Sequence, residues 1–255
     1  MLSFRLTTLE SVDSTNAQVK ALIEAQEPEG CVVRAFEQTG GYGRQGRAWA
    51  SPFGGMYQSI LLRPQVALAQ VPTITLVAGL AVRAALVGLC PDAESAAIQV
   101  KWPNDILCAQ GKLCGISAEM HKGALCVGVG VNVFAPADDP CVTGGNTPAY
   151  FADLAGWDAA DTRDQRAHIN AVGDAILDQL ARCYDEWNRC GIEAFLDEYR
   201  ASMALLGSGV RMVDQAGGLI AQGTVTGVDE MGRLVLVTAD GAVAISSGEA
   251  HIAKE

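Results

Sequence analysis

The sequence predicts an α+β protein, with a mixed or antiparallel sheet flanked by helices in residues 1–206 and a small β-barrel in residues 207–255. Three observations support this prediction. Strand-like segments cluster in residues 97–134, two stretches have the apolar pattern of helices, and short strands separated by glycine turns follow residue 207. A chain of 255 residues has room for one large and one small domain.

The first elements follow from capping and breaking residues. A helix of about three turns is expected to begin at the capping residues 13–16 and to end before Pro28. Small and β-branched residues predict a strand at 31–36. A second strand, at 56–63, is expected to stop at Pro64.

The middle of the chain holds the most apolar helix and most of the strands. Pro72 stands where a helix can begin without its missing N–H. Residues 73–89 are apolar on nearly every face, which predicts a buried helix rather than a membrane span. Strands are predicted at 97–102 and 124–134, with a hairpin between them at 105–120.

The last part of the chain changes from helical to strand-like patterns. Residues 134–150, with three prolines and two glycines, predict a loop, and helices are predicted at about 162–190 and 192–205. Apolar residues with the helical period mark the longer helix: Ile169, Val172, Ile176, Leu177, Leu180, Cys183, Tyr184 and Trp187. From Gly207, about five short strands predict the small barrel.

Charge and cysteine usage narrow the function. The formal net charge of −11 argues against binding nucleic acid through the bulk surface, whereas residues 34–63 hold four arginines and one acid, which favours an anionic small molecule. The eight cysteines include no C-x-x-C pair and the three histidines stand far apart, so no zinc site is expected. We expect the cysteines to be small buried side chains in a reducing cytosol, and the first residues lack the apolar core of a secretion signal.

The segment EQTGGYGRQGRAW, residues 37–49, has the G-x-G-x-x-G spacing of several nucleotide loops. A dinucleotide site needs a following helix and a later acid, but Pro52 and two glycines follow and no acid lies between Glu37 and Asp92. Protein-kinase and Walker A loops fail because their companion motifs are missing. A simple glycine hairpin remains, but it does not account for the two arginines and the tryptophan.

Four motifs, QTGGYGRQGRAW, KWPND, GKLCGISAE and GVGVNV, occur in the order found in biotin protein ligases, which the chain resembles. DSTN near the start and the closing SGEAHI fit the same family, so the resemblance spans essentially the whole chain. It implies a biotin/lipoate ligase-like catalytic domain and an SH3-like C-terminal barrel. It also implies an enzyme that converts biotin with ATP and Mg²⁺ to biotinyl-5′-AMP, releases pyrophosphate, and transfers biotin to a lysine with release of AMP.

The resemblance further implies a partner and a location. The acceptor would be the biotin carboxyl carrier part of acetyl-CoA carboxylase or a related carboxylase, in the cytoplasm. We expect a monomer or homodimer with no membrane and no nucleic acid as partner. Only about a dozen residues precede DSTN, which is too few for the DNA-binding domain of family members that repress transcription.

The resemblance also implies roles for individual residues. Arg44, Arg47 and Lys112 would neutralise the biotin carboxylate and the α-phosphate, with about 1.5–3 kcal/mol for each charge-assisted contact. Asp105 would orient or deprotonate the acceptor lysine. The implied biotin-binding residues are Ser14, Thr15, Asn16, Gln38, Gly41, Tyr42, Gly43, Arg44, Lys112 and Gly115. The implied adenylate-binding residues are Arg44, Arg47, Trp49, Asn104, Lys112, Gly130 and Asn132, with Mg²⁺ near Asn132 and no direct metal motif.

Several of these residues also fit purely structural roles. Ser14 suits a helix cap, Trp49 suits core packing, and Lys101 suits either the phosphates or a solvated strand end. Gly128 and Gly130 would either give a ligand room or relieve strand packing.

The loop departs from the family pattern G-R-G-R-x-G-R at Tyr42, which replaces the first arginine and removes one cation. Two other functions stay open: a lipoate or octanoate ligase of the same superfamily, and a non-catalytic biotin sensor. The GRQGRAW loop and the C-terminal β domain argue against the first, and the full set of cations argues against the second.

Overall fold

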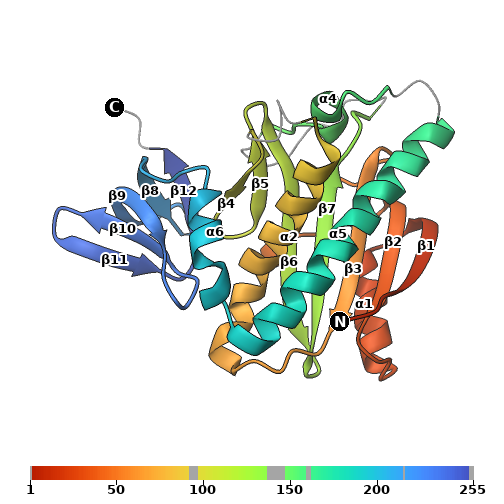
Figure 1. Cartoon of the computed structure of the whole chain (residues 1–255), viewed down its shortest axis with the longest axis horizontal. Helices are drawn as coiled ribbons and strands as arrows, with labels where there is room; N and C mark the ends of the chain where they lie inside the picture. Colours follow the sequence, from red (N-terminus) through yellow and green to blue (C-terminus); the bar gives the residue numbers. More distant parts are fainter. Residues whose placement is uncertain (1, 92–96, 137–146, 159–161, 215, 253–255) are drawn as a thin grey trace.

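A computed structural model of the chain describes residues 2–91, 97–136, 147–158, 162–214 and 216–252. These residues form two sheets, one of seven strands and one of five (Figure 1). Three helices pack on the larger sheet, and the smaller sheet lies beside it at the carboxyl-terminal end of the chain (Figure 1).

The larger sheet consists of β1 (Arg5–Val12), β2 (Cys31–Gln38), β3 (Gly55–Leu62), β4 (Gln99–Lys101), β5 (Asp105–Cys108), β6 (Gly111–His121) and β7 (Ala124–Asn132). Its order is β1-β2-β3-β7-β6-β5-β4. β1 is parallel to β2, and the other neighbouring pairs are antiparallel. The sheet is therefore mixed, as predicted. β1 itself was not predicted, because most of its side chains are exposed and carry no apolar signal.

Helices cover both faces of this sheet. α2 (Ile74–Leu89) and α5 (Thr162–Cys190) pack together on one face, and α1 (Thr15–Glu24) packs on the other (Figure 1). The main core lies under α2 and α5, and a smaller apolar cluster including Val19, Ile23 and Leu61 lies under α1. Among the described residues, the helical stretch Leu68–Leu89 is long and apolar enough to cross a membrane, but it is mostly buried, as expected of a core helix.

The helices after residue 150 differ in part from the prediction. α5 has the predicted bounds, but the helix predicted at 192–205 is a 3₁₀ turn, η3 (Glu193–Phe195), followed by the short α6 (Leu196–Ala201). It ends early because the backbone beyond it bonds to the edge strand β4: Val100 N donates to Ser202 O, and Ala204 N donates to Val100 O. A short helix, α4 (Phe151–Ala155), was not predicted. Much of the loop predicted at 134–150 lies outside the described residues.

The smaller sheet consists of β8 (Gly209–Val213), β9 (Leu219–Val228), β10 (Leu234–Thr238), β11 (Gly241–Ile245) and β12 (Glu249–Ile252). Its strands are antiparallel in the order β11-β10-β9-β8-β12. The five strands are as predicted, but a closed barrel is not confirmed, because no ladder among the described residues joins β11 to β12. The indole of Trp102 ties the two sheets together by donating to Gly232 O at 2.9 Å.

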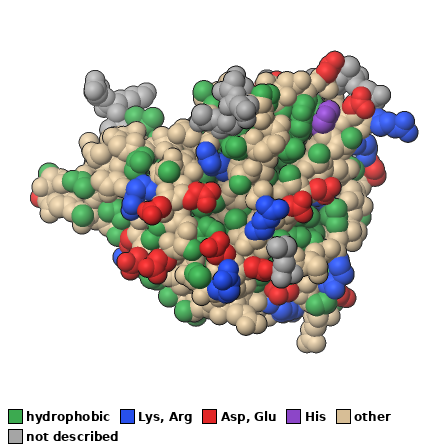
Figure 2. Space-filling model, in the orientation of Figure 1, with side chains coloured by type: hydrophobic (Ala, Val, Ile, Leu, Met, Phe, Trp, Pro, Cys, Tyr) green, Lys and Arg blue, Asp and Glu red, His purple; other side chains and the backbone are tan. Residues whose placement is uncertain are grey.

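The face that carries α2 and α5 is mixed in charge. Lysines and arginines lie interspersed with aspartates and glutamates over these helices (Figure 2). The described part of this face therefore does not resemble a basic surface for nucleic acid, which would gather cations on one side.

Candidate active site

A cleft of about 470 Å³ lies between the larger sheet, the glycine-rich loop (residues 40–47) and the C-terminal sheet. It gathers most of the predicted site residues, namely Thr15, Asn16, Gln38, Tyr42, Gly43, Arg44, Arg47, Trp49, Asn104, Asp105, Lys112, Gly115, Gly130 and Asn132. Ser14 and Gly41 are not among the lining residues. Lys101, which suits either a contact to the phosphates or a solvated strand end, also lines the cleft.

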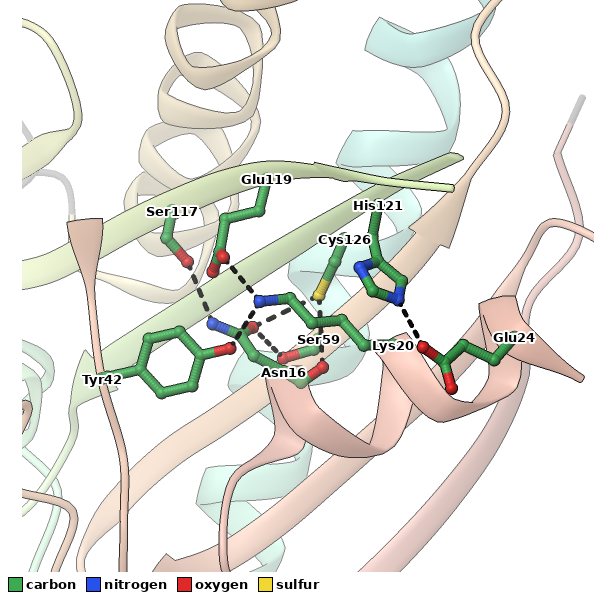
Figure 3. Close-up of polar contacts among 9 residues, drawn as sticks. All are labelled: Asn16, Lys20, Glu24, Tyr42, Ser59, Ser117, Glu119, His121 and Cys126. Carbon is green, nitrogen blue, oxygen red and sulfur yellow. Dashed lines mark hydrogen bonds and ion pairs between the residues drawn. The ribbon is translucent and has the colours of Figure 1, made fainter. Parts of the chain in front are cut away.

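Part of the cleft is a polar pocket lined by Thr15, Asn16, Gln38 and Ser117, and the fully buried Ser59 bonds to the first two of these. Thr15 N donates to Gln38 Oε1 at 2.8 Å, and Ser59 Oγ donates to Asn16 Oδ1 at 2.6 Å. Asn16 Nδ2 donates to Ser117 Oγ at 3.3 Å (Figure 3). These side chains are therefore held in fixed positions by each other before any ligand binds.

Two roles were predicted for Ser14, a helix cap and a contact to biotin, and its position bears on both. It occupies the N-cap position of α1, but its side chain makes no capping hydrogen bond. Its Oγ is buried and has no hydrogen-bond partner among the described residues. A buried hydroxyl without a partner is costly, which makes it a candidate for bonding to a ligand.

The glycine-rich loop is a short β-hairpin. Tyr42 pairs with Ala48, Gly43 N donates to Arg47 O at 2.8 Å, and the tip is one 3₁₀ turn, η1 (Arg44–Gly46). Gly46 has φ 71°, a conformation that glycine adopts without a steric cost. The hairpin interpretation of the loop is thus correct in geometry. No helix directly follows the loop, which agrees with the prediction that it is not a dinucleotide-binding motif.

The two loop arginines point to different partners. Arg44 is half-buried and donates to the side-chain oxygen of Asn104 at 2.8 Å, while Asn104 donates to Ile116 O. Burial lowers the pKa of Arg44, the carboxylate of Asp105 opposes this change, and the nearby cation Arg47 adds to it. A partly desolvated guanidinium held by a neutral amide favours an anionic ligand.

Arg47 is more exposed and forms an ion pair with Glu249 of β12. The loop therefore contacts both sheets. This connection between the glycine-rich loop and the end of the chain was not predicted.

Lys112 and Asp105 form an ion pair inside the cleft. Their Nζ and Oδ1 atoms are 2.7 Å apart, and only 17% and 13% of their side chains are exposed. The Lys112 ammonium also lies 5.1 Å from the ring centroid of Trp49. Asn132 Nδ2 donates to Lys112 O at 3.0 Å, so Asn132 helps to fix the strand that carries the lysine.

Two glycines of the cleft floor support Trp49. Gly115 and Gly130 are register partners on β6 and β7. A Cβ atom would lie 2.9 Å from the indole at Gly115 and 2.7 Å from it at Gly130. The close approach expected of these glycines is therefore made by Trp49 in this structure. The indole Nε1 is buried and has no hydrogen-bond partner among the described residues.

The sequence did not predict every residue of the site. Ser117 of the GKLCGISAE motif received no role, yet it lies in the polar pocket. The C-terminal sheet also lines the cleft, through Val213, Asp214, Ile220, Ser247, Gly248, Glu249, Ala250 and His251. The closing SGEAHI motif was the one sequence signal for this contribution.

Comparisons with known proteins show which family the chain resembles. The family model of the Biotin/lipoate A/B protein ligase family matches residues 8–133, and that of the Biotin protein ligase C terminal domain matches residues 205–251. The biotin–[acetyl-CoA-carboxylase] ligase of Mycobacterium tuberculosis is 33% identical over 96% of this chain and 88% of its own. The enzyme of that name from Paracoccus denitrificans is 31% identical over 89% of this chain and 92% of its own.

A solved structure shares the fold over nearly the whole length. It is the biotin protein ligase of Aquifex aeolicus in complex with biotin and ATP, with a TM-score of 0.78 and 30% identity, over 98% of this chain and 99% of that one. The fold and the family model thus define a protein ligase of the biotin/lipoate type. More narrowly, the chain belongs to the biotin protein ligase family, which confirms the resemblance carried by its motifs.

Proposed function

We propose that the chain joins biotin to a lysine of a biotin carboxyl carrier protein in two steps. First, the biotin carboxylate attacks the α-phosphorus of ATP, so that biotinyl-5′-AMP forms and pyrophosphate leaves. Then the lysine amine attacks the carbonyl carbon, the bond to the phosphate oxygen breaks, and AMP leaves. The observation that carries this proposal is a single cleft, in a chain of this family, that joins a buried polar pocket to the partly buried cations Arg44 and Lys112.

Arg44 and Lys112 lower the barrier of the first step. The reaction brings a carboxylate to a phosphate, and fixed cations stabilise the charge that builds up between them. Both are held before the ligands arrive, Arg44 by Asn104 and Lys112 by Asp105. Arg47, on the exposed side of the loop, adds a third cation when it leaves Glu249.

Asp105 acts in the second step. While it is paired with Lys112, its carboxylate is neutralised by the ammonium at 2.7 Å. When Lys112 turns to the phosphate, Asp105 is free to orient the acceptor lysine and to accept its proton. The pairing therefore makes the base available only after the substrates have entered the cleft.

We assign the polar end of biotin to the polar pocket. The buried side chains of Thr15 and Asn16 line the pocket and supply hydrogen bonds, and Gln38 positions Thr15. The unpartnered hydroxyl of Ser14 does not line the cleft in this structure and would have to turn toward the ligand to bond to it. Of the other predicted biotin-binding residues, Tyr42, Gly43, Arg44, Lys112 and Gly115 line the cleft around the ligand, and Gly41 stands beside them in the chain without lining it. The adenylate packs against Trp49 beside Asn104, Gly130 and Asn132.

Asn132 is the residue that would hold the Mg²⁺ brought by the phosphates of ATP, where the metal would neutralise phosphate charge. Asn132 uses its Nδ2 for Lys112 O, so its Oδ1 is the oxygen that would face the metal. Among the described residues, no group of three or more His, Cys, Asp or Glu side chains could hold a metal. This donor set fits a metal bound mainly by the nucleotide.

The wider predictions remain proposals. A boundary at residues 206/207 is supported by the separate C-terminal sheet and by the family model that begins at residue 205. We propose an SH3-like character for that sheet, a carrier domain of acetyl-CoA carboxylase or a related carboxylase as partner, and a cytoplasmic monomer or homodimer without nucleic acid or membrane as partner. Size-exclusion chromatography with and without the carrier measures the oligomeric state.

Pyrophosphate exchange tests the main proposal. With biotin and ATP, the protein should incorporate labelled pyrophosphate into ATP, and it should label the carrier only when the acceptor lysine is intact. Exchange with lipoate or octanoate but not with biotin would instead establish the superfamily alternative. Binding of biotin without exchange would establish the sensor.

A further inference from the structure

Three polar pairs connect α1 to β6 in a regular ladder. Asn16 contacts Ser117, Lys20 contacts Glu119, and Glu24 contacts His121 (Figure 3). The helix residues are four apart and the strand residues two apart. One helical turn therefore advances about as far as two strand residues, roughly 6 Å along each element. The first pair belongs to the polar pocket, and the third lies at the far end of the helix.

The middle pair also holds the glycine-rich loop. Lys20 Nζ lies 2.6 Å from Glu119 Oε2 and donates to the phenol oxygen of Tyr42 at 2.9 Å. The same ammonium lies 5.2 Å from the centroid of the Tyr42 ring. Tyr42 is thus bonded to a residue of α1 that β6 holds in place, whereas no contact of this kind reaches the loop from Glu24 or His121 (Figure 3).

The environment of Lys20 favours a permanent contact. The Lys20 and Glu119 side chains are 25% and 34% exposed, so solvent screens the pair less than a fully exposed one. Burial lowers the pKa of Lys20, but its hydrogen bonds to Glu119 and Tyr42 outweigh this and raise the pKa above its ordinary value. Lys20 is therefore a cation across the physiological pH range.

We propose that Lys20, fixed by Glu119, is a positioning residue that clamps Tyr42 and holds the glycine-rich loop over the cleft. Arg44 lies two residues beyond Tyr42, so a fixed hairpin base keeps its guanidinium within reach of Asn104. Lys20 and Glu119 are not among the residues that line the cleft, so they act on the reaction through the loop. The helix that supplies Thr15 and Asn16 to the pocket thereby also sets the position of the loop. The inference rests on the proposed function, since the clamp matters for keeping biotinyl-5′-AMP enclosed.

The release rate of biotinyl-5′-AMP tests the clamp. The protein is loaded with biotin and ATP labelled at the α-phosphate, freed of excess nucleotide, and followed without a carrier. Lys20→Met and Tyr42→Phe should each speed release about tenfold, the order expected for a lost hydrogen bond to a charged group. The double variant should release no faster than Lys20→Met alone, because the hydrogen bond that Tyr42→Phe removes is already lost when Lys20 is replaced. Lys20→Arg, which keeps the cation, should restore slow release.

Glu24→Gln is the matched control. It removes the negative charge from the third pair of the ladder and from the ion pair with Lys122, on the same helix and without touching the loop. It should release the adenylate at the wild-type rate. Wild-type release by Lys20→Met, or a double variant whose effect is the product of the two single effects, would overturn the clamp. Equal acceleration by Glu24→Gln would also overturn it, since the pairs would then only fasten the helix.

Limited trypsin digestion separates this inference from the proposed function. Trypsin cuts after Arg44 and Arg47, so its rate at these sites reports opening of the loop without any catalysis. Lys20→Met and Tyr42→Phe should raise cleavage there several-fold over cleavage at other sites, and Glu24→Gln should not. A wild-type protein that forms no biotinyl-5′-AMP would refute the proposed function, while the digestion pattern would still decide the clamp.

Discussion

The polar pocket and the glycine-rich loop face the same cleft but are built in opposite ways. In the pocket, Thr15 and Asn16 are buried and hydrogen-bonded to neighbours on four strands. In the loop, residues 45–48 are exposed, and three side-chain contacts hold the hairpin to the rest of the molecule. These contacts are Tyr42 with Lys20, Arg44 with Asn104, and Arg47 with Glu249.

This difference assigns recognition of biotin to the pocket and retention of the adenylate intermediate to the loop. Groups that are fixed before binding lose little conformational freedom when the ligand arrives, so the pocket is suited to selecting one ligand. A segment held by few contacts opens at low cost, so the loop is suited to admitting substrates and enclosing the intermediate. Changes in the pocket should therefore alter biotin affinity, and changes in the loop should alter loss of the adenylate.

The largest effect is expected at Lys112, which lies between the two regions. Lys112→Ala removes a preorganised cation from the first step and leaves Asp105 buried without its partner. We expect pyrophosphate exchange to fall by about 10²–10³-fold or more. Lys122→Ala is the control, because this exposed lysine pairs with Glu24 outside the cleft. Normal exchange in Lys112→Ala would mean that Lys112 has been wrongly assigned.

Gly128→Ala tests whether the pocket alone sets biotin affinity. The new Cβ would lie 2.4 Å from Asn16 Oδ1 and 2.7 Å from Ser117 Oγ, so both side chains must shift. Strain of about 1–3 kcal/mol in a packed site predicts a rise in the KM for biotin of roughly ten- to a hundredfold, with little change in the KM for ATP. Gly88→Ala is the control, since a Cβ added there meets no neighbouring side chain within 4 Å. An equal rise in both KM values would show that pocket and loop are not separate.

Arg44→Gly tests whether the loop retains the adenylate. It removes the contact with Asn104 but leaves the pocket intact. Adenylate should still form, at a rate reduced about tenfold, and should escape to label lysines of an unrelated protein such as albumin. Streptavidin blotting measures this labelling. The control Arg63→Gly alters an arginine outside the cleft and should label only the carrier. If Arg44→Gly also labelled only the carrier, the retention role of the loop would be wrong.

The same contrast explains what the sequence could predict. Apolar runs and helical periodicity identified β2, β3, β6, β7 and α5, because their burial leaves a local pattern. β1 leaves no such pattern, since it is largely exposed at the edge of the sheet. Barrel closure would need a ladder between the edge strands β11 and β12, and the packing of Trp49 on Gly115 and Gly130 joins three distant segments. Such contacts are not encoded within any one motif.

The site residues were identified through motifs rather than geometry. The motifs predicted that Arg44, Asn104 and Lys112 share one site. They did not predict that Asn104 bonds to Arg44 or that Asp105 pairs with Lys112. These pairings depend on the folded positions of β5 and β6. The role of Lys20 could not be predicted, because no motif includes it and a lysine on the second turn of a helix is usually solvated.

The smallest effect is expected at the contact between the loop and the C-terminal sheet. Glu249→Gln removes the partner of Arg47, and because these side chains are 43% and 59% exposed, the loss of stability should be at most about 1 kcal/mol. Freed from Glu249, Arg47 should interact more readily with the phosphates, so the KM for ATP should fall about two- to threefold while the KM for biotin stays constant. The difference from wild type should shrink at about 0.5 M salt, because exposed charges are then screened. A rise in the KM for ATP would instead mean that Glu249 holds Arg47 in its working position, and the loop would then depend on the C-terminal sheet as much as on Lys20.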